Sequence, residues 1–357
     1  MKHKAYLLAV VAASLMLSCS GPKKNSFEIK NGVNISHWLS QSRQRGESRK
    51  AYFTRSDVEY LAGLGYDHIR IPIDEEQMFT EDGQKEPEAF GLLHNALGWC
   101  EEFNLRAVVD LHILRSHHFN EGEKPLFTDA KAQEQFYECW RKISGELKKY
   151  SVDKVAYEPM NEPVADDPET WNKIVNRCVE VIRELEPRRT IIMGSNRWQS
   201  FNTVKDLRVP ENDPNIIISF HYYDPFLLTH YQATWTHTKD ITVPVHYPGQ
   251  LIADADMDSA ENFASAGKKI YNLDVMEKDF MQVIEVAKKY NLKIYCGEYG
   301  CIDKAPHEDK IRWYKDLYTL FERHGIARAN WDYKGGFAIV RRGEPQTEMI
   351  NAIISGK

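Results

Sequence analysis

The sequence predicts an α/β fold, a single (β/α)8 TIM barrel, and three observations favour it. The length of 357 residues suits one barrel domain, and no long linker or short repeat divides the chain after Ser26. Short apolar runs alternate with longer helical stretches, which is typical of parallel strands joined by helical crossovers. Polar and aromatic residues follow one apolar run after another, at the position where the active site of a barrel lies.

The composition fits a large buried core and argues against a nucleic-acid partner. Apolar residues make up 42% of the chain and charged residues 27%, so a folded globular domain is expected. The net charge is −6, and the charges are interspersed without a basic stripe. Nucleic acid is therefore a poor partner. A neutral substrate is compatible with this charge, and we expect a monomer.

The first residues of the chain predict export. Lys2 and Lys4 precede an apolar run at 5–17, which is too short to span a bilayer and has the build of a signal peptide. Cys19 follows the letters LMLS, which resemble a bacterial lipobox. We therefore predict a signal peptide at 1–18 and a lipid anchor on Cys19, in an outer-membrane lipoprotein facing the cell surface or the periplasm. Plain secretion is the alternative.

The remaining chain divides into a short polar tether at 19–26 and one barrel domain at 27–357. Eight runs in this domain predict the strands, because near-continuous apolar character fits strands that are buried on both faces. These runs are 28–35, 68–73, 106–112, 154–160, 190–194, 216–221, 293–297 and 328–331.

Helical patterns separate most of these runs. They are 54–64, 91–103, 130–150, 168–185, 274–290 and 308–324. The first begins at Thr54 and Asp57, a pair typical of a capping box, and it ends at Gly65. One segment, 224–271, is long, rich in aromatic residues and poor in helical periodicity. A connection of this length within a barrel is usually functional, so we predict an insertion after the sixth strand.

Two carboxylates at strand ends point to glycoside chemistry. Glu162 stands in YEPMNEP after the fourth strand, and Glu298 stands in YCGEYG after the seventh. Glycoside hydrolysis needs one carboxyl group that protonates the leaving oxygen and a second, ionised one that attacks carbon or activates water. The ends of two barrel strands can hold such groups about 5 Å apart, which is the separation of retaining enzymes.

Seven motifs, each at a predicted strand end, follow the order found in one enzyme family. They are GVNISHW, IRIPI, VVDLH, NEP, SFHYY, GEYG and NWDY. With this set the chain resembles glycoside hydrolase family 5, the cellulase-type family of the four/seven superfamily, over residues 27–331. The resemblance implies a retaining hydrolase of β-linked polysaccharide or oligosaccharide with no cofactor.

The resemblance also implies roles for individual residues. Glu162 would be the general acid/base and Glu298 the nucleophile, which Arg70 would keep ionised, because a nearby positive charge lowers the pKa of a carboxylate. The other implied contacts are Asn161 with the sugar 2-hydroxyl, His221 with Glu162, Tyr223 with Glu298, His112 on the glycone side and Trp331 beneath the sugar. Further candidates for the walls of the cleft are His37, Trp38, Trp198 and Trp235.

Several alternatives stay open at this point. The leading substrate is a β-1,4-glucan, and the same mechanism would serve a β-mannanase or an exo-acting β-1,3-glucanase. A surface glycan-binding protein on an inactive barrel would have lost a catalytic carboxylate, whereas both are present. An oxidoreductase or aldolase barrel would need a phosphate loop, a Schiff-base lysine or a Gly-rich fingerprint, and none of these stands at a predicted strand end.

The cluster at 116–118 has no acidic partner at ligand spacing, so no metal site is predicted. Cys296 and Cys301 flank a strand end and could pair.

Overall fold

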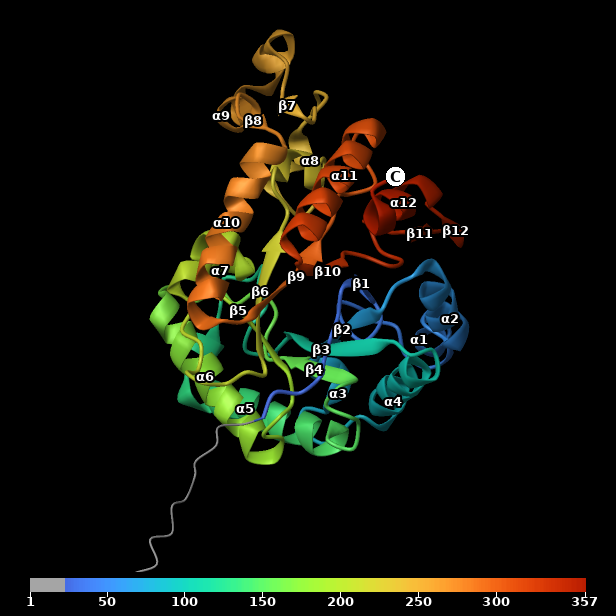
Figure 1. Cartoon of the computed structure of the whole chain (residues 1–357), viewed down its shortest axis with the longest axis vertical. Coiled ribbons are helices and arrows are strands. Elements are labelled where there is room, and N and C mark those ends of the chain that lie inside the picture. Colours follow the sequence, from blue (N-terminus) through green and yellow to red (C-terminus); the bar gives the residue numbers. More distant parts are fainter. Residues whose placement is uncertain (1–22) are drawn as a thin grey trace, which may run out of the picture.

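The chain folds as a closed barrel of eight parallel strands surrounded by helices, as predicted (Figure 1). The computed structural model describes residues 23–357. Around the barrel the strands follow the order β1-β10-β9-β6-β5-β4-β3-β2, and β1 closes the ring by pairing with both β2 and β10. Parallel strands end at the same rim, so residues that follow different strands come together there.

The eight barrel strands match the eight predicted runs in number and place. They are β1 (Asn31–Asn34), β2 (His68–Asp74), β3 (Arg106–Ile113), β4 (Val155–Glu158), β5 (Ile191–Gly194), β6 (Ile216–Tyr222), β9 (Lys293–Tyr299) and β10 (Ala327–Asn330). The fourth run was predicted to reach residue 160, but β4 ends at Glu158. Pro159 follows it, and a proline has no N–H with which to continue the ladder.

The predicted helices are also present, with shifted ends. They are α2 (Arg55–Leu64), α4 (Pro87–Glu102), α5 (Ala130–Leu147), α6 (Pro168–Leu185), α10 (Leu273–Tyr290) and α11 (His307–His324). The capping box of α2 forms, since the backbone N–H of Thr54 donates to Asp57 at 2.7 Å. Helix α4 begins four residues before the predicted start, because the side chain of Glu86 accepts from the amides of Glu88 and Ala89.

Some elements of the structure were not predicted, because their sequences have no clear periodic pattern. The short helix α12 (Thr347–Ser355) packs against α11, and η2 (Phe201–Asp206) takes the place of a long helix between β5 and β6. The predicted insertion follows β6 and consists of short pieces (Figure 1). These pieces are α8 (Phe226–Thr229), η3 (His237–Asp240), β7 (Gly249–Gln250), η4 (Asp254–Phe263), α9 (Ala264–Gly267) and β8 (Ile270–Tyr271).

Two cores stabilise this architecture. The larger lies between the strands and the surrounding helices. The smaller core fills the barrel interior. Its members project inward from the strands or lie at the end of the barrel where the strands begin. They are Phe27, Val108, Ala156, Ile192, Ile217, Tyr295 and Ala329. Because Phe27 precedes β1 and belongs to the same cluster as residues of six strands, it closes the end of the barrel where the strands begin.

The residues just before Phe27 are attached to the same end of the barrel. The backbone N–H of Asn25 donates to Asn215 at 2.8 Å, and its side-chain amide donates to Thr190 at 2.9 Å. The backbone N–H of Ser26 donates to Asp153 at 2.9 Å. The described chain therefore enters at the face opposite the strand ends. The predicted signal peptide and Cys19 lie outside the described residues.

Two further observations concern membrane spans and cysteines. Within residues 23–357, no helix combines the length and the apolar character that crossing a bilayer requires. Cys296 and Cys301 are both buried and free, so the pairing considered above is wrong. Their thiols instead approach backbone carbonyls, that of Cys296 at Glu298 and that of Cys301 at Leu228.

Candidate active site

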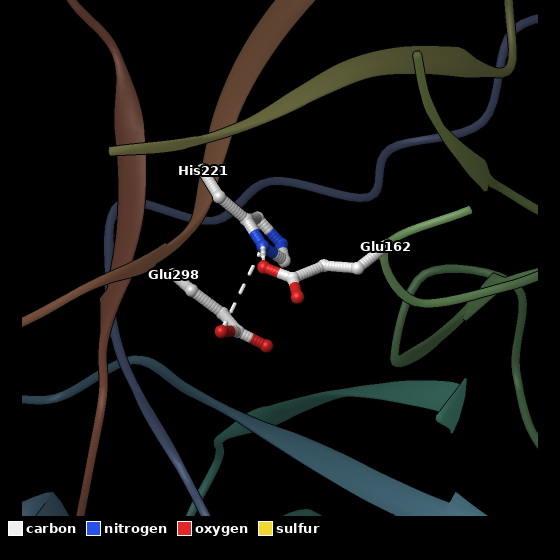
Figure 2. A group of neighbouring side chains, drawn as sticks. All are labelled: Glu162, His221 and Glu298. Carbon is white, nitrogen blue, oxygen red and sulfur yellow. Dashed lines mark hydrogen bonds and ion pairs between the residues drawn. The ribbon is translucent and has the colours of Figure 1, made fainter. Parts of the chain in front are cut away.

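Glu162 and Glu298 meet at the rim where the strands end. Glu162 follows β4, and Glu298 lies in β9. One oxygen of each carboxyl group and Nδ1 of His221 lie within 4.8 Å of one another (Figure 2). His221 Nδ1 is 2.9 Å from Glu162 Oε1 and 3.7 Å from Glu298 Oε2. This close approach is near the carboxyl separation of retaining glycosidases, about 5–5.5 Å, and below the roughly 6.5–9.5 Å of inverting ones.

The surroundings of Glu162 favour its protonated form. Burial, and next the charge of Glu298, raise the pKa of Glu162 well above its ordinary value. Burial, and next the charge of Arg70, lower the pKa of His221 well below its ordinary value, so this imidazole is neutral at physiological pH. With a neutral His221 beside it, the protonated carboxyl group of Glu162 can act as a proton donor.

Glu298 has a positive partner that Glu162 lacks. Burial raises the pKa of Glu298, while the charge of Arg70 opposes this rise. Arg70 Nη1 lies 2.7 Å from Glu298 Oε1, and the hydroxyl of Tyr223 donates to Oε2 at 2.9 Å. Both contacts stabilise the carboxylate form, so Glu298 is the member of the pair suited to act as an anion.

Arg70 is the electrostatic centre of the site. Its side chain is fully buried and lies 3.0 Å from Asp110, 2.7 Å from Glu158 and 2.7 Å from Glu298. It also donates to the amide oxygen of Asn161 at 2.9 Å, which fixes the orientation of that amide. A buried guanidinium is tolerated only with such partners, and in return it holds three carboxyl groups in place.

His112 and Trp331 form a flat pair beside the carboxylates. Their rings are stacked with centroids 5.5 Å apart and planes only 8° from parallel. His112 Nδ1 lies 2.6 Å from Asp110, and burial lowers the pKa of His112 to about 3. Trp331 follows β10 and is 8% exposed. His112 is 1% exposed, so Trp331 is the more accessible member of a largely buried pair next to the two carboxyl groups.

The exposed aromatic side chains stand on the loops around this centre. Trp235 in the insertion is 56% exposed, and its ring lies 6.4 Å from that of Phe337. Phe337 lies 6.2 Å from the ring of Tyr223, which joins Trp235 to the site through one intervening ring. Trp198 is 46% exposed, and its indole N–H donates to Phe119. His37 is partly exposed in the loop after β1.

Trp38 does not belong to the cleft, so its prediction as a substrate contact is wrong. Its side chain is 1% exposed, and its indole N–H donates to the carbonyl of Arg49 at 2.9 Å. Its ring packs against Phe53, with centroids 5.2 Å apart. No face of this indole is open to a sugar.

Two residues of the site were not singled out for it. Glu158 is fully buried, and its carboxyl group lies 2.7 Å from Arg70. Gln199 was missed altogether. It is fully buried, its amide oxygen accepts from the backbone N–H of Glu162 at 3.0 Å, and its amide nitrogen donates to Glu158 at 2.9 Å. No motif marks it, because its position depends on an unusual backbone path.

One cluster among residues 23–357 has the spacing of a metal site, and it is the pair of carboxylates with His221. Its donors are already engaged, since His221 Nδ1 faces Glu162 at 2.9 Å and Arg70 faces Glu298 at 2.7 Å. A second cation would compete with the guanidinium for the same carboxylate. The donor set fits hydrogen-bonded acids better than metal ligands.

Comparison with known proteins places this site in a family. The family model described as cellulase (glycosyl hydrolase family 5) matches residues 30–336. The chain is 31% identical to endoglucanase C of Acetivibrio thermocellus over 85% of its length and 91% of that protein. It is also 31% identical to cellodextrinase A of Ruminococcus flavefaciens, over 84% of each chain.

A solved structure shows the same fold. An endoglucanase from the hyperthermophilic Thermotoga maritima superposes with a TM-score of 0.76 at 23% identity, covering 91% of this chain and 97% of that one. The family model spans most of the chain, and both Glu162 and Glu298 fall within the matched residues. The chain therefore belongs to glycosyl hydrolase family 5, the cellulase family.

Proposed function

We propose that this protein hydrolyses β-1,4-glucan with retention of configuration at the cleaved carbon. The observation that carries the proposal is the meeting of two carboxyl groups within 4.8 Å at one rim. The protonated form of the partly buried Glu162 is favoured, whereas the buried Glu298 faces an arginine. That combination of short separation and opposite environments is what a two-step displacement at a sugar carbon requires.

In the first step the carboxylate of Glu298 attacks the anomeric carbon. The bond to the leaving oxygen breaks, and that oxygen takes the proton of Glu162. In the second step Glu162, now ionised, accepts a proton from water, and the resulting hydroxide attacks the same carbon and releases Glu298. Each step inverts the carbon, so the product keeps the β configuration.

The neighbouring residues would support these steps. Arg70 and Tyr223 would keep Glu298 anionic, and His221 would hold the carboxyl group of Glu162 in position. Asn161 would face the sugar 2-hydroxyl. The walls of the cleft would be His112 and Trp331 next to the reacting carbon, with His37 and Trp235 farther along it.

The names of the relatives suggest the class of substrate but not the length of the substrate chain. One is named an endoglucanase and another a cellodextrinase, both at 31% identity. We therefore propose internal cleavage of β-1,4-glucan, with action on short cello-oligosaccharides as the second candidate. A β-mannanase or an exo-acting β-1,3-glucanase would use the same carboxylates, and a substrate screen distinguishes them.

We also propose that the enzyme is exported and held at a membrane through Cys19. The sequence before residue 23 supports this, as does the placement of Asn25 on the barrel face opposite the cleft. An anchor at that end would leave the active-site rim facing away from the membrane.

The function is tested with reducing-sugar assays on β-glucan, mannan and xyloglucan, with the variants Glu162→Gln and Glu298→Gln. We expect the wild-type protein to prefer β-glucan and the variants to lose activity, by about 10²–10⁴-fold for the acid/base variant. Proton NMR of the first product should show the β-anomer. Glu285→Gln, an exposed change on α10, is the control and should retain full activity. An α-anomer, or activity in Glu298→Gln, would contradict the mechanism.

A further inference from the structure

The segment that follows β5 has an unusual backbone. Arg197, Trp198 and Gln199 have φ angles of 57°, 60° and 51°, three consecutive residues in the left-handed region. Residues other than glycine adopt this region rarely, so such a run persists only where surrounding contacts hold it. Glu162, across from this segment, also has a positive φ, of 45°.

Several of the contacts that hold the segment lead to the loop that carries Glu162. The backbone N–H of Trp198 donates to Pro163 at 3.3 Å. Asn196 forms a two-way pair with the backbone of Ala165, at 2.8 and 2.9 Å. Gln199 then accepts from the backbone N–H of Glu162 itself at 3.0 Å. The two loops are therefore joined along their length, and Gln199 makes the contact closest to the proposed acid/base.

Gln199 also continues a chain of contacts toward the proposed nucleophile. Its amide nitrogen donates to Glu158 Oε1 at 2.9 Å. The other oxygen of Glu158 accepts from Arg70 Nε at 2.7 Å, and Arg70 Nη1 lies 2.7 Å from Glu298. A continuous path of hydrogen bonds thus runs from the backbone of Glu162 to the carboxylate of Glu298, and the three bonds after the first are buried and involve a charged group.

The side chain of Gln199 packs closely over Gly194. A Cβ added to Gly194 would lie 2.0 Å from the amide nitrogen of Gln199, so a side chain at 194 would displace it. The amide also suits both of its neighbours, since the carboxylate of Glu158 needs a donor and the N–H of Glu162 needs an acceptor. A carboxylate or an apolar side chain of similar size would satisfy only one of them or neither.

We propose that Gln199 is a positioning residue, which fixes the backbone of Glu162 relative to Glu298 so that the acid/base delivers its proton to the leaving oxygen. The inference rests on the proposed hydrolysis, because it assigns Gln199 a part in one step of it. A residue that acts only through the acid/base matters in proportion to how much help the leaving group needs.

The experiment compares Gln199→Met with wild type on two aryl β-cellobiosides. The phenyl compound has a poor leaving group that needs protonation, and the 2,4-dinitrophenyl compound has a good one that does not. We expect kcat/KM to fall about 10–100-fold on the phenyl compound and less than about 3-fold on the dinitrophenyl compound. Glu162→Gln shows the full pattern for comparison. Gln135→Met, an exposed change on α5, is the matched control and should leave both values unchanged.

A second variant guards against misfolding of the first. Gln199→Glu keeps the shape but replaces the donor with a carboxyl group beside Glu158. When that carboxyl group is protonated it can donate to Glu158 and accept from the N–H of Glu162, and when ionised it repels Glu158. We expect near wild-type kcat/KM on the phenyl compound at acidic pH and a selective loss as the pH rises, while the dinitrophenyl compound follows the wild-type profile.

The outcomes separate this inference from the proposed function. If both variants lose the same factor on both compounds at every pH, Gln199 is merely structural and the inference is overturned. If the wild-type protein cleaves neither compound and no cello-oligosaccharide, the proposed function fails and the inference falls with it. A leaving-group-dependent loss in Gln199→Met, together with the pH-dependent loss in Gln199→Glu, supports the inference.

Discussion

At the scale of single residues, Asp74 is a carboxyl group whose pKa is strongly changed by burial. It ends β2 at the active-site rim, where its Oδ2 accepts from the backbone N–H of Gln41 at 2.7 Å. Its Oδ1 meets no hydrogen-bond partner among residues 23–357. Burial raises the pKa of Asp74 to about 7, from an ordinary value of 3.8, and the nearby charge of Asp110 adds to the rise. The native state therefore prefers this carboxyl group protonated.

This preference makes stability depend on pH. Between pH 4 and 7 the unfolded chain loses the Asp74 proton while the native chain keeps it, so the free energy of unfolding falls as the pH rises, and it levels off above 7. Asp74→Asn should remove the penalty. We expect its stability relative to wild type to improve by about 3 kcal/mol between pH 4.5 and pH 8, measured by urea unfolding.

The control for this experiment is Asp240→Asn, at an exposed position. It should leave the difference between the two pH values close to that of wild type. An Asp74→Asn protein whose stability relative to wild type is the same at both pH values would contradict the assignment of the penalty to this carboxyl group.

At the scale of elements, the strand ends were predictable and the loops beyond them were not. Glu162 and Glu298 follow buried apolar runs closely, and the geometry of a parallel barrel brings such positions to one rim. Trp38 lies four residues past the end of β1, after His37 has turned the chain with a φ of 55°. The alternation of side chains in a strand no longer holds there, so its inward direction could not be deduced.

The same reason explains why Gln199 was missed. It lies five positions after Gly194, the end of β5, and beyond a left-handed turn. Its contacts with Glu158 in β4 and with Glu162 in the following loop connect positions about 40 residues apart in the chain. Local pattern carries no record of such a contact, whereas Arg70 could be assigned because it lies within a strand.

The insertion after β6 is the element that we expect to govern how long a substrate the cleft holds. Trp235→Ala removes an exposed ring that a sugar could stack on. We expect KM for cellohexaose to rise about 5–10-fold, equivalent to roughly 1–1.4 kcal/mol. The kcat/KM for a phenyl β-cellobioside, which has four fewer sugar rings to stack, should stay within about 2-fold. Steady-state kinetics on both substrates measure the difference.

A surface leucine provides the control for the aromatic ring. Leu185→Ala, an exposed change on α6, removes apolar surface away from the cleft and should alter neither substrate. Equal losses on the long and the short substrate in Trp235→Ala would mean that the ring supports the fold of the insertion, with no contact to a distant sugar.

At the scale of the whole molecule, the two carboxyl groups and the N-terminal attachment lie on opposite faces of the barrel. The rim where the strands end carries the carboxylates, and the other face is closed by Phe27 and holds Asn25 through Asn215 and Thr190. Because Asn25 is fixed to the barrel, only the six residue-to-residue steps from residue 19 to residue 25 could separate a lipid on Cys19 from that face. At about 3.3–3.6 Å per residue this is roughly 20 Å at full extension.

The anchor itself is tested by producing the full chain in a Gram-negative host and partitioning the product in a detergent that separates into two phases. We expect the wild-type protein in the detergent phase and Cys19→Ala in the aqueous phase, because one sulfur carries the lipid that makes the difference. Ser20→Ala, one position along the same tether, is the control and should behave as wild type. Both variants should retain hydrolysis, since the barrel and its active-site rim lie beyond the tether. Wild-type protein that enters the aqueous phase would instead indicate plain secretion, and the catalytic assignment would be unaffected.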